Sequence, residues 1–230
     1  RTVGRNGGTA MSRSNFNRLG AVGICTFPLL WSPACGGELA PDPPATRQEC
    51  LAAADFAEPS TSPYCLPFPI GASHSVSQSY CSPPPGSHET RFAYDFAMSL
   101  GTEVRAARAG VVVELREHWL DSDRTAGHEN MVSLRHEDET ISLYLHLRNQ
   151  GVVPEMGDSV PMGGLLGYSG NTGDSSGFPH LHFQVCLRGG MCSWKTGEYT
   201  LPVSFKNALG PIDSRGGLLL GSSYEAGNCS

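Results

Sequence analysis

The chain has 230 residues, of which 39% are hydrophobic and 17% are charged, with 28 glycines and 17 prolines. This length allows one medium-sized domain with extensions, and the glycine and proline content favours a turn-rich β domain over a helical bundle. The formal net charge of -6 excludes the basic surface that a nucleic-acid partner requires, so we expect no such partner.

Residues 1–35 have the pattern of an export signal. Arg13 and Arg18 precede an uncharged stretch over residues 19–34 that is short for a membrane span and is interrupted by prolines. The letters SPAC, which end at Cys35, resemble a bacterial lipobox imperfectly, so the sequence leaves open whether Cys35 carries a lipid. We expect an exported protein that is periplasmic, anchored to the outer membrane by that lipid, or secreted.

The eight cysteines are dispersed and contain no CxxC pair, which argues against a zinc ribbon or a thioredoxin-like motif. Dispersed cysteines in a chain rich in proline and glycine indicate an oxidising compartment. Once Cys25 and Cys35 are assigned to the signal and its end, six cysteines remain, which permits three disulfides. Cys186 and Cys192 are close enough to staple a hairpin. The sequence does not pair the other four, which are Cys50, Cys65, Cys81 and Cys229.

Three regions follow the signal. Residues 36–63, rich in Pro, Ala, Glu and Ser, predict a tether with one helical turn near residues 48–56. Residues 64–215 alternate short apolar stretches with turn residues, which predicts a mainly β, antiparallel domain with few helices. Residues 216–230 are weakly patterned and are expected to form a C-terminal tail. The candidate strands span residues 91–97, 104–109, 111–116, 131–136, 141–147, 165–169 and 180–187.

Three of these strands place an ionisable side chain opposite an apolar face, because successive strand residues face opposite ways. In HLHFQV, the apolar side chains share one face, and His180 and His182 share the other. In ISLYLHL, isoleucine and the leucines face away from His146, and in RFAYDFA the aromatic residues face away from Asp95. If the strands lie in one sheet, these four residues converge, and imidazole with carboxylate suits zinc. Each residue alone is more often a packed, surface or turn residue, so the prediction rests on the combination.

Four segments resemble the lysostaphin/LytM-type zinc peptidases, which cleave peptidoglycan cross-links and have the duplicated hybrid motif β fold. The segments are YDFAMSLGTEVRAARAGVVVEL (94–115), YLHL (144–147), GDSVPMGGLLGYSGNTGDSSG (157–177) and PHLHFQV (179–185). They stand in the family's order and cover most of a catalytic domain. The resemblance implies a zinc peptidase domain over residues 64–215, with an antiparallel, β-sandwich-like fold.

The resemblance also implies roles for single residues. Asp95 and His182 match metal ligands, whereas His146 and His180 match catalytic histidines. The sequence does not decide which of the two catalytic histidines acts as the base.

The third metal ligand departs from the family pattern. It is usually a histidine four residues before the aspartate, but Arg91 stands there and does not bind zinc. Part of the family has a longer insert at this point, so we assign His88, seven residues before Asp95, with His74 as the alternative. The resemblance therefore implies one Zn²⁺ per chain.

The expected function is that of a zinc-dependent endopeptidase, acting as a monomer, that hydrolyses peptide cross-links of peptidoglycan with a metal-activated water. No HExxH and no GxSxG motif offers another hydrolytic mechanism. The alternative is a non-catalytic envelope protein of the same fold that binds the wall or activates other wall hydrolases. A protease that acts on proteins is a third class of function, because no feature of the sequence identifies the substrate.

The remaining polar residues have simpler interpretations. We expect His118, His128 and His136 at the surface, and Arg135 and Arg148 as solvated charges. Asn171 is expected to serve a turn rather than to line the cleft. Six glycines of the matched segment are expected in turns with positive φ, namely Gly101, Gly110, Gly157, Gly167, Gly170 and Gly173.

Overall fold

The computed structural model describes residues 46–83, 88, 91–187, 192 and 199–229, all within the unit that spans residues 39–230. The expected export signal and the lipid anchor at Cys35 lie outside these residues. Within the described part of the chain, no helix combines the length and the apolar character needed to cross a membrane.

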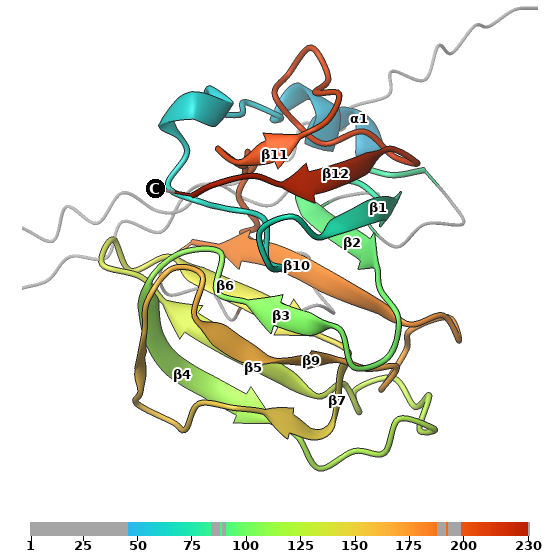
Figure 1. The fold of residues 1–230 in the computed structure, drawn as a ribbon. Helices are drawn as coiled ribbons and strands as arrows, with labels where there is room; N and C mark the ends of the chain where they lie inside the picture. The colour runs from blue at the N-terminus through green and yellow to red at the C-terminus, as the bar shows by residue number, and fades with distance from the viewer. Residues whose placement is uncertain (1–45, 84–87, 89–90, 188–191, 193–198, 230) are drawn as a thin grey trace, which may run out of the picture. The chain divides into compact units, whose positions relative to one another are not determined.

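The described chain is mainly antiparallel β-structure, which confirms the predicted fold class (Figure 1). Its one α-helix within these residues is α1 (Arg47–Ala52), and η1 (Pro59–Thr61) is a short 3-10 helix. The strands are β1 (Ser73–Gln78), β2 (Ala93–Ala97), β3 (Glu103–Arg105), β4 (Gly110–Arg116), β5 (Met131–Arg135), β6 (Ile141–Leu145), β7 (Leu147–Val152), β8 (Ser159–Val160), β9 (Leu165–Ser169), β10 (His180–Cys186), β11 (Ala208–Leu209) and β12 (Ser223–Ala226). Nine of them form one sheet in the order β11-β12-β1-β2-β10-β6-β5-β4-β8, and β3, β9 and β7 form a second sheet.

Strand β10 lies in the middle of the larger sheet, between β2 and β6. As predicted, Leu181, Phe183 and Val185 share one face of β10 and are fully buried. Tyr144 of β6 lies opposite Phe183 and packs on it, with ring centroids 5.3 Å apart. The main hydrophobic core therefore lies on this side of the sheet, and the opposite face of β10 carries the histidines.

Residues 46–63 are part of the folded domain, which corrects the expected tether over this stretch; residues 36–45 lie outside the described residues. The side chain of Thr46 caps α1 by accepting a hydrogen bond from the backbone N–H of Glu49, at 3.2 Å. Cys50 is fully buried and forms a disulfide with Cys81. The expected helical turn thus exists, and a covalent bond fixes it to the sheet.

The expected C-terminal tail also belongs to the sheet. Strand β12 pairs with β1, with Tyr224 opposite His74. Tyr224 and Ala226 are buried while their neighbours in the strand are exposed, which is the period of two that a half-buried strand shows. The short alternation SYEA was therefore a strand signal that the sequence interpretation missed.

Three disulfides join the described residues, as the cysteine count predicted: Cys50–Cys81, Cys65–Cys229 and Cys186–Cys192. The last is the predicted hairpin staple. The first attaches α1 to the chain just after β1, and the second joins the chain before β1 to the chain after β12. Both pairings were beyond what sequence spacing could decide.

The six glycines expected at positive φ divide into two groups. Gly101, Gly157 and Gly173 have φ of 80°, 88° and 71°, as predicted. The other three do not have positive φ and are required by close packing instead. At Gly170, for example, a Cβ atom would lie 2.3 Å from the backbone nitrogen of Arg148, where no side chain fits.

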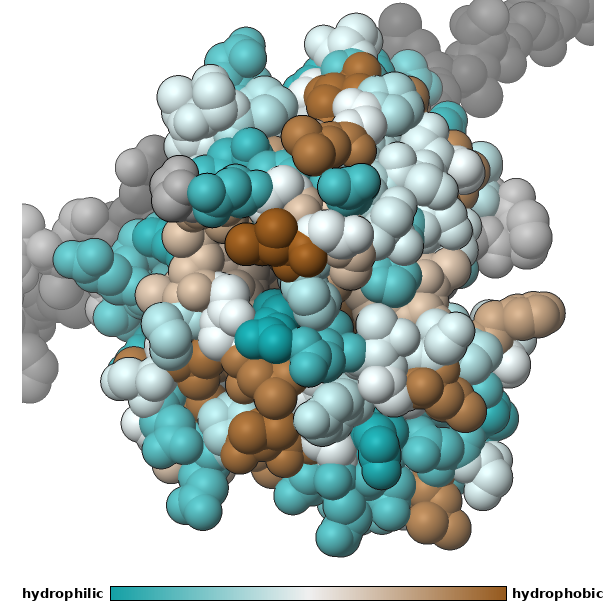
Figure 2. Space-filling view, in the orientation of Figure 1, coloured by the Kyte–Doolittle hydropathy of each residue, from teal (hydrophilic) through white to brown (hydrophobic). Residues whose placement is uncertain are grey.

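The molecular face shown in Figure 2 carries hydrophobic side chains in small patches separated by hydrophilic ones. Isolated apolar residues are ordinary on protein surfaces, whereas large continuous patches mark partner sites. That face therefore gives no sign of an extensive apolar interface.

His136 is buried, which corrects its expected place at the surface, whereas His118, Arg135 and Arg148 are exposed as predicted. Nδ1 of His136 donates a hydrogen bond to the carbonyl of Ala109 at 2.8 Å. Burial lowers the pKa of His136 below its ordinary 6.5, and the nearby charge of Arg108 lowers it further, although the bond to Ala109 opposes the shift. The folded protein therefore holds this imidazole neutral.

We predict that His136 contributes to acid destabilisation. Because its folded pKa is lower than its unfolded pKa, the unfolded chain takes up the proton first, and stability falls as the pH drops below about 6.5, by at most about 1.4 kcal/mol per pH unit. His136→Asn retains a donor for Ala109 without a titrating group and should flatten this loss. Urea unfolding between pH 7.5 and pH 5, with chelator present, measures it. An equal slope in His136→Asn, the wild type and the control His118→Asn would contradict the prediction.

Candidate metal centre

Strand pairing places Asp95 and His182 side by side. Asp95 of β2 lies directly opposite His182 of β10 in the antiparallel register, so both side chains leave the sheet on the same face. The Nδ1 atom of His182 is 2.9 Å from Oδ1 of Asp95. Both residues are buried, with 3% of the surface exposed for Asp95 and 4% for His182.

His88 completes the group from a segment outside the strands. Its Nε2 atom lies 3.3 Å from Oδ1 of Asp95 and 3.2 Å from Nδ1 of His182. The His88 side chain is fully buried. Within the described residues, His88, Asp95 and His182 are the group of potential ligands whose donor atoms lie close enough to hold one metal ion.

Gln184 orients His182 within this group. Its Oε1 lies 3.0 Å from Nε2 of His182, and because an amide oxygen only accepts, that nitrogen carries the hydrogen. Nδ1 of His182 then presents a lone pair toward Asp95 and His88. Metal-bound histidines typically use one ring nitrogen for the metal and donate from the other to such an acceptor.

The donor set fits zinc on chemical grounds. Two imidazole nitrogens and a carboxylate oxygen meet in a buried space, and these are ligand types that zinc prefers. Burial opposes ionisation of Asp95, but electrostatic interactions with the imidazoles of His88, His180 and His182 outweigh it and hold the pKa of Asp95 well below its usual range. Burial lowers the pKa of His182, which favours the neutral imidazole that binds metals.

His180 stands next to the group, two residues before His182 on the same face of β10. Its Nδ1 lies 2.8 Å from the carbonyl oxygen of Phe178, which fixes the hydrogen on Nδ1. Its Nε2 is 3.8 Å from Oδ2 of Asp95, and 12% of the side chain is exposed. In the neutral imidazole, the lone pair of His180 Nε2 therefore faces the candidate centre.

His146 reaches the same place by a route that strand alternation does not predict. In the observed register, Tyr144 faces the main core with Phe183, so a continued strand would direct His146 to that side, away from His182. Instead β6 ends at Leu145, and His146 has a φ of 63°, in the left-handed region. The expected convergence is found, but a backbone reversal causes it.

The surroundings of His146 fix its tautomer. Nδ1 lies 2.7 Å from the carbonyl oxygen of Thr172 and therefore carries the hydrogen. The ring centroid is 4.5 Å from that of His180 and 6.3 Å from that of His182. Burial, reinforced by the electrostatic interaction with the neighbouring His180 ring, lowers the pKa of His146 to about 3, so the His146 imidazole is neutral near pH 7.

Two other residues considered for the centre lie elsewhere or play other parts. His74, the alternative third ligand, bonds through Nδ1 to the carbonyl of Ala97 at 3.1 Å and packs on Phe68, outside the group. The side chain of Asn171 accepts a hydrogen bond from Ser175 Oγ within a turn, as expected.

The sequence interpretation missed Gln184 and Thr172. Gln184 had a signal, because it follows His180 and His182 at the same spacing of two. Thr172 acts through its backbone carbonyl, which no side-chain pattern reveals.

Comparisons with known proteins agree with this site. The family model for peptidase family M23 matches residues 89–193, which include Asp95, His146, His180 and His182 and begin just after His88. A peptidoglycan DD-endopeptidase, ShyA of Vibrio cholerae, is 40% identical over 41% of this chain and 20% of its own length. Lysostaphin of Staphylococcus simulans is 37% identical over 40% of this chain and 17% of its own length.

An uncharacterized metalloprotease of Buchnera aphidicola is 31% identical over 56% of this chain and 32% of its own. The chain thus spans less than a third of each of these relatives. The solved catalytic domain of lysostaphin from Staphylococcus simulans is 28% identical, over 56% of this chain and 87% of that domain, with a TM-score of 0.41. The family match over residues 89–193 shows that this part of the chain is a peptidase M23 domain.

Proposed function

We propose that this chain is a zinc-dependent endopeptidase that hydrolyses peptide cross-links of bacterial peptidoglycan. The observation that carries the proposal is the buried group of His88, Asp95 and His182, with two further histidines beside it in a peptidase domain. The name of one related protein, a peptidoglycan DD-endopeptidase, supports the substrate class. The completeness of this set disfavours the non-catalytic alternative, because an intact centre of this kind has little structural use.

His88, Asp95 and His182 would hold one zinc ion and leave a coordination position open. When bound, a zinc ion would lower the pKa of a coordinated water to about 7 and polarise a substrate carbonyl. The role of the chain is to fix three donors in a site from which most water is excluded. Gln184 serves this role by keeping Nδ1 of His182 turned toward the other two donors.

His146 and His180 are the proposed proton carriers. Each donates Nδ1–H to a backbone carbonyl, of Thr172 and Phe178 respectively, so each keeps an Nε2 lone pair free. Such a nitrogen accepts the proton of the attacking water and can return it to the leaving amine. His180, which is partly exposed, stands on the side from which a substrate enters, and buried His146 stands behind it.

The proposed location is outside the cytoplasm, where the substrate lies. The three disulfides support it, since such bonds persist in oxidising compartments. A lipid at Cys35 and a monomeric state remain parts of the proposal.

We predict that the purified full chain releases cleaved cross-linked peptides from isolated sacculi and that a chelator abolishes the release. Asp95→Ala and His182→Ala should lose bound zinc and activity together, because each removes a ligand. His146→Ala should keep one zinc per chain and lose about 10²–10⁴-fold in kcat, the usual effect of removing a proton-transfer group. Mass spectrometry of the products and metal analysis measure both quantities.

The matched control is His118→Ala, which replaces an exposed histidine away from the group and should keep full activity. Sacculi left intact by a wild-type protein that contains zinc would contradict the substrate assignment. Full activity in Asp95→Ala would contradict the mechanism.

We further predict that Gln184→Leu weakens zinc binding by about 10- to 100-fold, because the His182 ring loses the acceptor that orients it. Gln184→Glu keeps an oxygen acceptor at the same place and should restore most of the affinity. Competition with a chromogenic chelator gives the dissociation constants without reference to activity. Equal affinity in Gln184→Leu and the wild type would show that Gln184 does not orient the ligand.

A further inference from the structure

The third donor of the centre has a different kind of support from the other two. Asp95 and His182 stand on paired strands, and the sheet fixes their separation. His88 belongs to no strand, yet its side chain is fully buried and its Nε2 meets both partners. Something outside the sheet must therefore hold the segment that presents His88.

Backbone hydrogen bonds connect His88 with residues next to β1 and β2. The N–H of Cys81, after the end of β1, donates to the carbonyl of Arg91 at 3.0 Å, just before β2 begins. The N–H of Arg91 in turn donates to the carbonyl of His88 at 3.2 Å. The position of His88 thus depends on the place where Cys81 and Arg91 meet.

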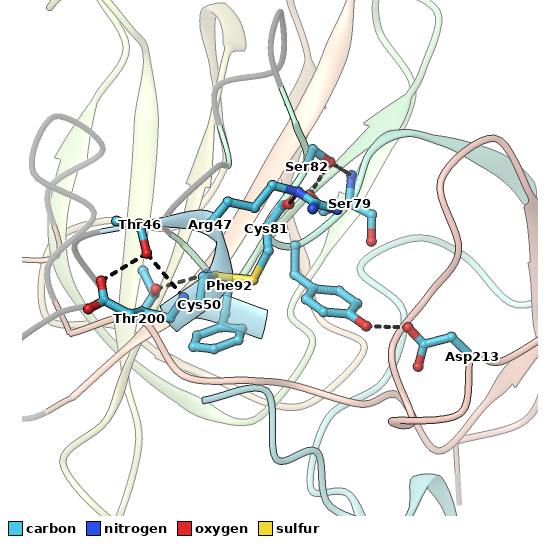
Figure 3. The surroundings of a disulfide bond; sticks show 11 residues. Thr46, Arg47, Cys50, Ser79, Cys81, Ser82, Phe92, Thr200 and Asp213 are labelled. Carbon is cyan, nitrogen blue, oxygen red and sulfur yellow. Dashed lines mark hydrogen bonds between the residues drawn. A yellow bond between two sulfur atoms is a disulfide. The ribbon is translucent and has the colours of Figure 1, made fainter. Parts of the chain in front are cut away.

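Cys81 is itself fixed from the N-terminal side, as Figure 3 shows. Its side chain forms the disulfide with Cys50 of α1, and its carbonyl oxygen accepts a hydrogen bond from Nε of Arg47 at 2.8 Å. Cys81 has a φ of 48°, a left-handed conformation that non-glycine residues adopt only when their surroundings enforce it. The helix thus holds this residue through one covalent bond and one hydrogen bond.

Aromatic packing joins the same helix-containing segment to both ends of the His88 segment. The ring of Phe56 lies 4.7 Å from that of Tyr80, which precedes Cys81, and 6.2 Å from that of Phe92, which follows Arg91. Tyr80 and Phe92 also stack, with centroids 6.3 Å apart. One N-terminal segment therefore contacts the chain immediately before and immediately after the residues that carry His88.

We propose that residues 46–56, with the Cys50–Cys81 disulfide, form a clamp that positions His88 for metal binding. None of the clamp residues belongs to the donor group, so they act on the metal only through His88 and are positioning residues. This inference rests on the proposed function, because it takes the group of His88, Asp95 and His182 as the zinc site. In this inference, residues 46–56, which precede the region matched by the family model, help to assemble the centre.

The test compares two disulfides in the full chain. Cys50→Ala/Cys81→Ala, the clamp variant, removes the covalent bond of the clamp, and alanine at both positions leaves no free thiol there to bind zinc. Cys65→Ala/Cys229→Ala is the matched control, since it removes a disulfide of sequence separation 164 rather than 31, which should lower thermal stability at least as much. Zinc dissociation constants are measured by chelator competition at 25 °C on protein shown to be folded by circular dichroism.

The clamp variant should bind zinc at least about tenfold more weakly, whereas the control should stay within about threefold of the wild type despite its lower melting temperature. Arg47→Ala removes only the hydrogen bond to Cys81 and should weaken binding several-fold, and it serves as the test if the double variant does not fold. Unchanged zinc affinity in the clamp variant or, failing that, in Arg47→Ala would overturn the proposal, as would equal losses in clamp and control.

The two proposals fail in different ways. A wild-type protein that binds no zinc refutes the proposed function itself. If the wild-type protein binds zinc, but no more tightly than the clamp variant, only the clamp is refuted.

Discussion

The structure depends on three potential metal-ligand atoms that lie within 3.3 Å of one another in a buried space: His88 Nε2, Asp95 Oδ1 and His182 Nδ1. A hydrogen on Nε2 of His88 can bridge that nitrogen to the other two atoms. It leaves the 2.9 Å contact between Asp95 Oδ1 and His182 Nδ1, two acceptors, without a hydrogen between them. A divalent cation satisfies all three donors at once, and this requirement supports the assignment of the centre.

The centre combines a rigid part with parts that the sheet does not control. Register between β2 and β10 fixes Asp95 and His182, because a slip of one residue would send either side chain to the other face. His88 and His146 come from outside regular strands, one from a segment next to a disulfide and one from a left-handed residue at a strand end. Strained backbone of this kind persists where the surroundings enforce it, often at functional sites.

The sequence predicted most of the β-structure and the residues that gather at the centre, because alternation in β10 and β2 reports directly on which side chains share a face. The sequence could not predict how His146 joins them. Alternation in β6 directs His146 to the core, and only its positive φ turns the side chain to the other face of the sheet. The composition of residues 46–63 suggested a tether, whereas the disulfide between Cys50 and Cys81 and the packing of Phe56 fix this stretch to the rest of the domain. Burial of His136 was missed because a single polar residue carries no periodic signal.

The most direct test is a crystal structure of the zinc-loaded chain, with anomalous scattering measured on both sides of the zinc absorption edge. The account predicts one zinc per chain, about 2.0–2.2 Å from His88 Nε2, Asp95 Oδ1 and His182 Nδ1, with Gln184 bonded to the far nitrogen of His182. Zinc bound through His74 in place of His88, or no zinc between Asp95 and His182, would contradict it.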